Sequence, residues 1–158
     1  MAGRLRARRR RAAAQGGANG RGAGTGALPV EETREVAFVS ILADTSVWVD
    51  FLRNREAALV GPLRQGDVVL HDYVIGELAL GGVSQAKLAM FGQMRRCRSA
   101  SHDEVMHLIA ERGLAGRGLG YVDAHLLAAA LIGRLKLWTL DKPLRRVAQE
   151  CGCALAVH

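Results

Sequence analysis

From residue 36 onward, short apolar runs alternate with segments of helical periodicity, the pattern of an α/β fold built on a parallel sheet. The apolar runs are four to eight residues long and are bounded by turn-forming or charged residues, as buried strands are. Five runs are predicted as strands: Ala37–Asp44, Asp67–Leu70, Arg96–Ala100, Leu135–Leu140 and Ala154–Val157. The chain is therefore expected to fold around one central sheet.

The segments between these runs have the spacing of amphipathic helices. In the first, Trp48, Phe51 and Leu52 stand at i, i+3 and i+4, which places them on one face and predicts core packing. Residues 62–66, bracketed by proline and glycine, are predicted as a turn region. Val122–Ile132 is almost wholly apolar and must be buried on most sides. Four further helices are expected at Tyr73–Leu80, Lys87–Met94, Asp103–Arg112 and Pro143–Glu150.

Residues 1–36 differ in composition from the rest of the chain. They consist mainly of Arg, Gly and Ala, with few apolar side chains to bury. Fixing the backbone costs about 1 to 2 kcal/mol per residue, and this composition cannot offset that cost. We therefore predict a disordered extension over residues 1–36 and a folded domain over residues 37–158.

The net charge of +7 belongs to the first 30 residues, which hold seven Arg and no acid. Residues 31–158 carry 15 basic and 15 acidic side chains, so the chain beyond residue 30 is neutral. The run Arg8–Arg11 can bind phosphates through charge alone. A solvated tail, or sequence that precedes the native start, is the favoured explanation.

Three cysteines, an odd number, do not form a disulfide framework and favour a reducing compartment. The N-terminus lacks the apolar segment of a signal peptide, and no run approaches the roughly 18 apolar residues that a membrane span requires. We expect a cytoplasmic protein without membrane association.

Four acidic residues stand where a ligand site of a parallel sheet is expected, beyond the carboxyl ends of the strands. Asp44 and Asp141 directly follow predicted strands, whereas Glu77 and Asp123 interrupt helices that are otherwise apolar. Two unit charges about 4 Å apart repel by roughly 4 kcal/mol at an effective dielectric constant near 20. If these carboxylates converge, they need protons or a bound cation.

An all-oxygen acidic cluster suits Mg²⁺ or Mn²⁺ rather than Zn²⁺. Two such ions can activate water and stabilise the leaving oxygen in phosphodiester hydrolysis. Each acid taken alone also has a structural explanation. Asp44, Asp123 and Asp141 can cap helices, the last favoured by the following Pro143, and Glu77 can be exposed at a helix edge.

Four motifs occur in an order and spacing similar to a known family. They are ILADTSVWVDFL at residues 41–52, GEL at 76–78, GYVDAHLLAAA at 120–130 and LWTLDKPLRRVA at 137–148. They resemble the PIN-domain ribonucleases, and among these the VapC-type toxins of bacterial toxin–antitoxin pairs, over about residues 41–157. The resemblance implies a PIN-like three-layer α/β/α sandwich with a central, mainly parallel sheet. It also implies a Mg²⁺- or Mn²⁺-dependent endoribonuclease acting on RNA.

The resemblance further implies site residues and partners. The family's catalytic, metal-binding acidic quartet matches Asp44, Glu77, Asp123 and Asp141. Thr45 or Ser46 would assist through hydroxyl or water contacts, and Thr139 would orient the last acid. The toxins commonly form homodimers and are silenced by a cognate antitoxin, often through a basic side chain placed in the acidic pocket. The long extension before Ala37 departs from the family pattern, in which the first strand begins almost at the start methionine.

The leading hypothesis is a metal-dependent endoribonuclease toxin, in which metal-activated water attacks phosphorus and leaves 5′-phosphate and 3′-hydroxyl ends. A non-catalytic RNA- or protein-binding module with the PIN fold is the alternative. A phosphate-handling domain of receiver or haloacid dehalogenase type ranks third, because no second acid stands two residues after Asp44 and no expected Lys follows the final strand. Three further residues lie near the motifs: Asp72 as an additional site acid, Arg117 as a phosphate contact, and His125 in a structural role.

Overall fold

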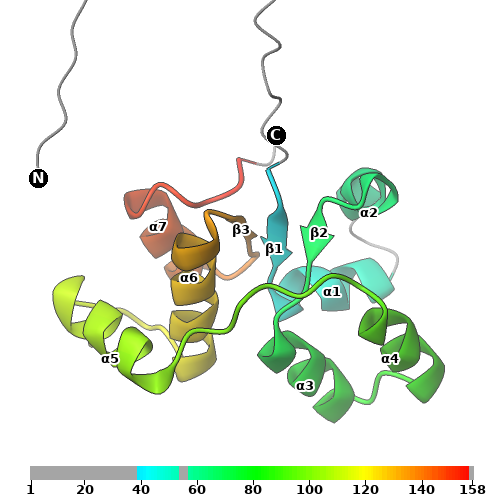
Figure 1. Cartoon of the computed structure of the whole chain (residues 1–158), viewed down its shortest axis with the longest axis horizontal. Helices are drawn as coiled ribbons and strands as arrows, with labels where there is room; N and C mark the ends of the chain where they lie inside the picture. Colours follow the sequence, from blue (N-terminus) through cyan, green and yellow to red (C-terminus); the bar gives the residue numbers. More distant parts are fainter. Residues whose placement is uncertain (1–38, 54–56, 157–158) are drawn as a thin grey trace, which may run out of the picture. The chain divides into compact units, whose positions relative to one another are not determined.

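Three parallel strands form the centre of the computed structural model, which describes residues 39–53 and 57–156 (Figure 1). The strands are β1 (Ile41–Ala43), β2 (Val68–Val69) and β3 (Lys136–Trp138), in the order β2-β1-β3. Ile41 pairs with Val68 on one side and Lys136 on the other. All three residues of β1 are buried, as expected for the central strand of a parallel sheet.

Two of the predicted strands are reduced to single bridges at the sheet edges. Leu70 pairs with Arg96, and Leu137 pairs with Ala154, both in parallel. The strand predicted over Arg96–Ala100 is therefore wrong beyond its first residue. Its exposed Arg side chains are typical of an edge that ends after one pair. At the other edge the predicted strand also stops at its bridge, and Val157 lies outside the described residues.

Helices fill the connections, with α1–α4 beside β2 and α5–α7 beside β3 in Figure 1. Most lie within two residues of the predicted bounds. They are α1 (Thr45–Leu52), the 3₁₀ helix η1 (Ala57–Leu59), α2 (Val60–Gln65), α3 (Asp72–Leu80), α4 (Gln85–Gly92), α5 (His102–Glu111), α6 (Tyr121–Gly133) and α7 (Lys142–Glu150).

The turn predicted over residues 62–66 is wrong, because α2 occupies most of it. Pro62 lies in the first turn of α2, where backbone N–H groups have no acceptor within the helix and proline is tolerated. Gly66 ends the helix with φ of 75°, a left-handed conformation that suits glycine. The first predicted strand is also shorter than expected. It begins at Ile41, after the exposed Val39, whereas Ala37 and Phe38 lie outside the described residues.

The core is built around α6 and the sheet. The seven residues 124–130 of α6 are all buried, as the apolar run predicted. Trp48 of α1 is buried as well and packs edge-on against Phe91, with ring centroids 5.0 Å apart. The longest described helix, α6, has 13 residues, and none of the described helices is long and apolar enough to cross a bilayer. The predicted domain boundary after residue 36 lies outside the described part of the chain and stays a prediction.

Candidate active site

Asp44 stands at the junction of β1 and α1, where its side chain is held in one orientation. Its backbone N–H donates to Trp138 O of β3 at 2.8 Å. Its Oδ2 accepts from Ser46 Oγ and Thr139 Oγ1, each at 2.7 Å, and the residue is only 6% exposed. Asp44 occupies the N-cap position of α1, but its side chain makes no capping hydrogen bond. The buried carboxylate is therefore not explained by helix capping.

Glu77 approaches this junction from α3. Its Oε2 accepts a short hydrogen bond from Thr45 Oγ1, the first residue of α1. The carboxylate is half-buried rather than exposed at a helix edge. The neighbouring hydroxyls of Thr45 and Ser46 thus hold different acids, Glu77 and Asp44, and fix both to the start of α1.

Asp123 lies in the first turn of α6 and reaches back to the chain before the helix. Its Oδ2 accepts from Gly120 N at 2.7 Å. Burial raises the pKa of this carboxyl, and the charges of Asp44, Asp141 and Glu77 raise it further, against the lowering effect of the Gly120 N–H. Three carboxylates from other elements therefore lie within electrostatic range of Asp123.

Asp141 combines a structural contact with its place in this cluster. Its Oδ1 accepts from Leu144 N at 2.8 Å and caps α7, so the capping interpretation is correct for this residue. Its own N–H donates to Thr139 Oγ1 at 3.0 Å. Because the same hydroxyl donates to Asp44, buried Thr139 connects the first and last acids of the cluster.

The donor set fits a hard divalent cation, because the four acids offer only carboxylate oxygens as ligands. Within residues 39–53 and 57–156, no three His, Cys, Asp or Glu side chains stand close enough to hold an ion by themselves. Mg²⁺ seldom needs such a cage. It keeps several waters and binds through one or two carboxylates together with substrate phosphates. Cation binding would also relieve the mutual repulsion that raises the pKa of Asp123.

Two of the additional candidates already have partners. The Asp72 carboxylate forms an ion pair with Arg96, and Arg117 binds both carboxylate oxygens of Glu150 at 2.6 and 2.7 Å. His125 is buried, and its ring packs against the rings of Tyr73 and Tyr121, with centroids 4.7 and 4.6 Å apart. None of the three is among the groups that shift the pKa of Asp123.

Arg145 lies beside the cluster and was missed at the sequence level. Its Nε and Nη2 donate to the carbonyl oxygen of Thr139 at 3.2 and 3.0 Å. The available signal was its spacing, since Arg145 stands four residues after Asp141 and therefore lies one helical turn away.

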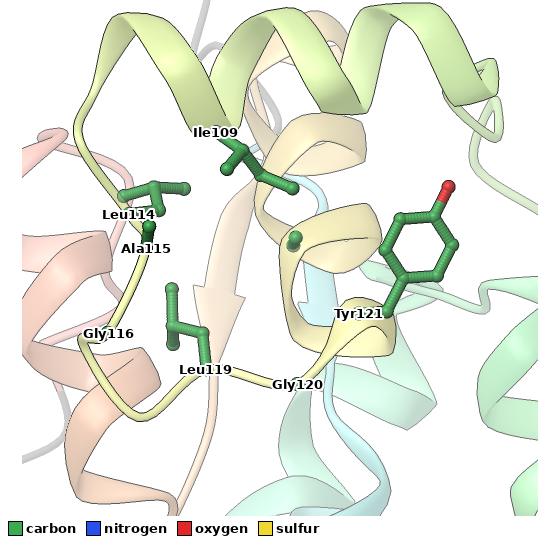
Figure 2. Close-up of a pocket in the computed structure, with 8 residues that line it drawn as sticks. Ile109, Leu114, Ala115, Gly116, Leu119, Gly120 and Tyr121 are labelled. Carbon is green, nitrogen blue, oxygen red and sulfur yellow. The ribbon is translucent and has the colours of Figure 1, made fainter.

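Two cavities lie near the carboxyl edge of the sheet. The first, of about 250 Å³, lies between α5, the loop that follows it and the first turn of α6. Figure 2 shows Ile109, Leu119 and Tyr121 around it. The second, of about 460 Å³, is lined by Thr139, Leu140 and Arg145, among others. The first cavity is mainly apolar, whereas the second has a guanidinium group in its wall.

A family model described as the PIN domain matches residues 41–150, which include all four acids. The chain belongs to the PIN-domain family. This PIN domain is similar to Ribonuclease VapC32 of Mycobacterium tuberculosis, in each of two strains, with 45% identity over 119 residues. The match covers 73% of this chain and 96% of the relative, so the chain is a homologue of a VapC ribonuclease toxin.

Solved structures show the same fold. PAE2754 from Pyrobaculum aerophilum aligns with a TM-score of 0.53 and 18% identity, covering 75% of this chain and 90% of that one. FitAcB from Neisseria gonorrhoeae aligns with a TM-score of 0.51 and 21% identity, covering 69% and 93%. The predicted family and the PIN-like α/β fold are confirmed. Ribonucleases of the PIN family are typically metal-dependent.

The Thr139 hydroxyl offers a test of how the acids are oriented. Thr139→Val removes the donor to Asp44 and the acceptor for Asp141 N while keeping the side-chain shape. Loss of an outer-shell partner of this kind typically costs about 10- to 100-fold in activity. It also leaves a buried polar group unpaired, which costs about 1 to 3 kcal/mol of stability. Cleavage assays and urea denaturation measure the two effects. Thr139→Ser is the matched control, and equal impairment of both variants would contradict the role of the hydroxyl.

The raised pKa of Asp123 predicts a pH-dependent stability. A carboxyl whose pKa is higher in the folded state binds its proton more tightly there, so its ionisation destabilises the fold as pH rises through the folded pKa. Asp123→Asn removes the charge and keeps an acceptor for Gly120 N. In EDTA at pH 7 it should melt above the wild type, and this advantage should disappear below the unfolded pKa of about 3.9. Melting curves across this pH range measure it, and a less stable variant at pH 7 would contradict the prediction.

Proposed function

We propose that this PIN domain is a metal-dependent endoribonuclease toxin that hydrolyses RNA phosphodiester bonds and is neutralised by a cognate antitoxin. The observation that supports the proposal is the set of hydrogen bonds through Thr45, Ser46 and Thr139 that connects Glu77, Asp44 and Asp141 at the ends of β1 and β3. Asp123 lies within electrostatic range of these three acids. The similarity to Ribonuclease VapC32 over 96% of its length supports the same activity.

In this proposal Asp44, Glu77, Asp123 and Asp141 are the catalytic and metal-binding residues, and the cation is Mg²⁺ or Mn²⁺. When bound, such an ion lowers the pKa of water and neutralises charge that develops on the phosphate oxygens. The protein contributes acids held in place before substrate arrives. Asp44 is fixed by Ser46 and Thr139, Glu77 by Thr45, and Asp123 by the Gly120 N–H. Such preorganisation limits the reorganisation required during the reaction.

Protonation of Asp123 should make cation binding by the acidic cluster depend on pH. Its raised pKa makes its carboxyl more prone than a free Asp to keep a proton when no cation is present. That proton must leave before the carboxylate can bind a cation, so cation affinity falls as the solution becomes more acidic.

The proposed partners follow from the same site. RNA is the substrate, and the antitoxin is expected to place a basic side chain against the acidic cluster, where charge complementarity favours it. We also propose that the toxin forms a homodimer and acts in the cytoplasm, where its RNA substrate is found. Size-exclusion chromatography with light scattering tests the dimer.

Induced expression tests the function in cells. Wild-type protein should arrest growth and produce cleaved RNA, whereas Asp44→Asn should do neither at the same expression level. The non-catalytic alternative makes a different prediction. The protein would bind RNA without turnover in Mg²⁺ or Mn²⁺, and deletion of residues 1–36 would abolish that binding. Growth arrest that persists unchanged with Asp44→Asn would overturn the proposed function.

A further inference from the structure

The cavity of about 460 Å³ lies at the carboxyl end of β3, beside the candidate active site rather than within it. Thr139 and Leu140 form one wall, Arg145 and Gln149 of α7 form another, and residues 155–156 complete it. Its volume is in the usual range for small-ligand sites, about 300 to 1,000 Å³. It therefore has room for part of a nucleotide.

Arg145 provides this cavity with a positive charge in a fixed position. Two of its N–H groups donate to the Thr139 carbonyl oxygen, at 3.2 and 3.0 Å. In the described part of the chain no carboxylate pairs with it, in contrast to Arg96, Arg98 and Arg117, which each bind an acid. A guanidinium group has five N–H donors, so donors remain for a ligand. The group is thus oriented by the backbone while its charge is not neutralised.

The same two residues join the cavity to the acidic cluster. The carbonyl oxygen of Thr139 accepts from Arg145, and the hydroxyl of Thr139 donates to Asp44. The next residue, Leu140, donates its N–H to Ser46 Oγ at 3.1 Å, and Ser46 in turn donates to Asp44. A single residue, Thr139, therefore connects the guanidinium group of Arg145 to the carboxylate of Asp44.

RNA is a polyanion, so its binding beside the acidic cluster requires a positive charge such as that of Arg145. The four carboxylates repel phosphates, and the folded domain over residues 37–158 has only a small excess of basic residues, 14 Lys and Arg against 12 Asp and Glu. Guanidinium groups bind phosphate oxygens through paired, charge-assisted hydrogen bonds. Gln149 stands one turn after Arg145 on α7 and adds a neutral donor on the same side.

We propose that Arg145 and this cavity bind an RNA phosphate neighbouring the one that is cleaved, and so place the substrate across the acidic cluster. This inference rests on the proposed function, since it assigns a subsite of the same RNA. Arg145 is in this view a substrate-binding residue, and its contact with Thr139 keeps its guanidinium group in position.

Binding of a short single-stranded RNA tests the proposal without requiring turnover. The full chain is used with Asp44→Asn so that RNA is not cut, and Kd is measured over a series of salt concentrations. Arg145→Gln keeps a donor for the Thr139 carbonyl but removes the charge. It should weaken binding about tenfold, since hydrogen bonds to charged groups contribute about that much. The slope of log K against log salt should fall by about 0.7, the value for one phosphate contact on a single strand.

Arg146→Gln is the matched control, because Arg146 is the neighbour on α7, is exposed like Arg145, and has no ion pair or side-chain hydrogen bond in the described residues. It should leave both the affinity and the salt slope near those of the Asp44→Asn parent. Equal effects of the two substitutions would overturn the assignment of Arg145. Arg145→Lys should recover the salt slope and only part of the affinity, because it restores charge without the planar fork.

A second measurement locates the phosphate. A set of RNAs is made in which one phosphate at a time is replaced by a neutral methylphosphonate. Replacement of the phosphate that Arg145 contacts should weaken binding to the Asp44→Asn parent. The same replacement should not weaken binding to the Arg145→Gln variant further, because that variant has already lost the contact. Additive losses at every position would overturn the inference.

If Arg145 had only a structural role, its substitution would change different quantities. Arg145→Gln introduced into the otherwise wild-type chain would then lower the melting temperature and kcat and leave KM unchanged. That result would also overturn the proposal. Absence of cleavage by the wild-type protein, in contrast, would count against the proposed function and not by itself against the binding result.

Discussion

Asp44→Asn is expected to reduce RNA cleavage by roughly 10³-fold, because removing a cation-binding carboxylate costs several kcal/mol of transition-state stabilisation and each 1.36 kcal/mol is a factor of ten in rate. Asp44 is the most buried of the four acids and accepts hydrogen bonds from both Ser46 and Thr139. Asn keeps the size of the side chain and one oxygen acceptor, so the fold should persist. Single-turnover cleavage of labelled RNA measures the loss, and circular dichroism confirms folding.

Asp50→Asn is the matched control for this substitution. Asp50 is on the same helix, α1, and makes no side-chain hydrogen bond or ion pair in the described part of the chain. At 100° per residue the six-residue step from Asp44, which lies just before the helix, rotates the side chain by about 240°, so the two side chains point about 120° apart. Its substitution should leave the cleavage rate unchanged. Full activity of Asp44→Asn, or equal loss in both variants, would contradict the placement of Asp44 in the catalytic site.

Removal of divalent cations is expected to abolish cleavage altogether. Without a cation, burial and the charges of Asp44, Asp141 and Glu77 oppose ionisation of Asp123, and the carboxylates repel an incoming phosphate. Protein treated with EDTA should show only background cleavage, and Mg²⁺ or Mn²⁺ in excess should restore the full rate.

Binding of the divalent cation should also be visible in the melting temperature of the protein. A ligand that binds only the folded state raises the melting temperature as its concentration rises. Mg²⁺ should therefore stabilise the wild type and stabilise Asp123→Asn less, because that variant has lost one carboxylate. Cleavage that continues unchanged in EDTA would show that the acids do not act through a cation. A melting temperature that rises equally in both proteins would place the bound ion elsewhere.

Most of the fold could be predicted because its elements have strong local signals. The apolar run of α6 and the strand–acid junctions at Asp44 and Asp141 are visible in the sequence, and each lies where the pattern placed it. The edge strands and α2 were not predicted correctly. Whether an edge pairs over one residue or five depends on tertiary context, and Pro62 is compatible with either a turn or a first helical turn.

For the site, the sequence could name the acids but not their contacts. Asp44 and Asp141 were identified from their position after strands, and Glu77 and Asp123 from their charge within apolar helices. The hydrogen bond from Thr45 to Glu77 joins residues 32 positions apart, and Thr139 lies 95 positions from Asp44. Such contacts depend on how α1, α3 and β3 pack together. Arg145 was missed for the same reason, because its partner is a backbone carbonyl that no side-chain pattern reveals.

The chemical ends of the cleaved RNA test the central claim most directly. If the four carboxylates act with a divalent cation to direct water at phosphorus, the products have 5′-phosphate and 3′-hydroxyl ends, and cleavage does not use the 2′-hydroxyl group. The measurement treats Mg²⁺-dependent products with a 5′-phosphate-specific exonuclease and analyses them by mass spectrometry. Products with 5′-phosphate and 3′-hydroxyl ends are the expected result. Products with 2′,3′-cyclic phosphate and 5′-hydroxyl ends would contradict it, because the attacking group would then be the RNA's own 2′-hydroxyl.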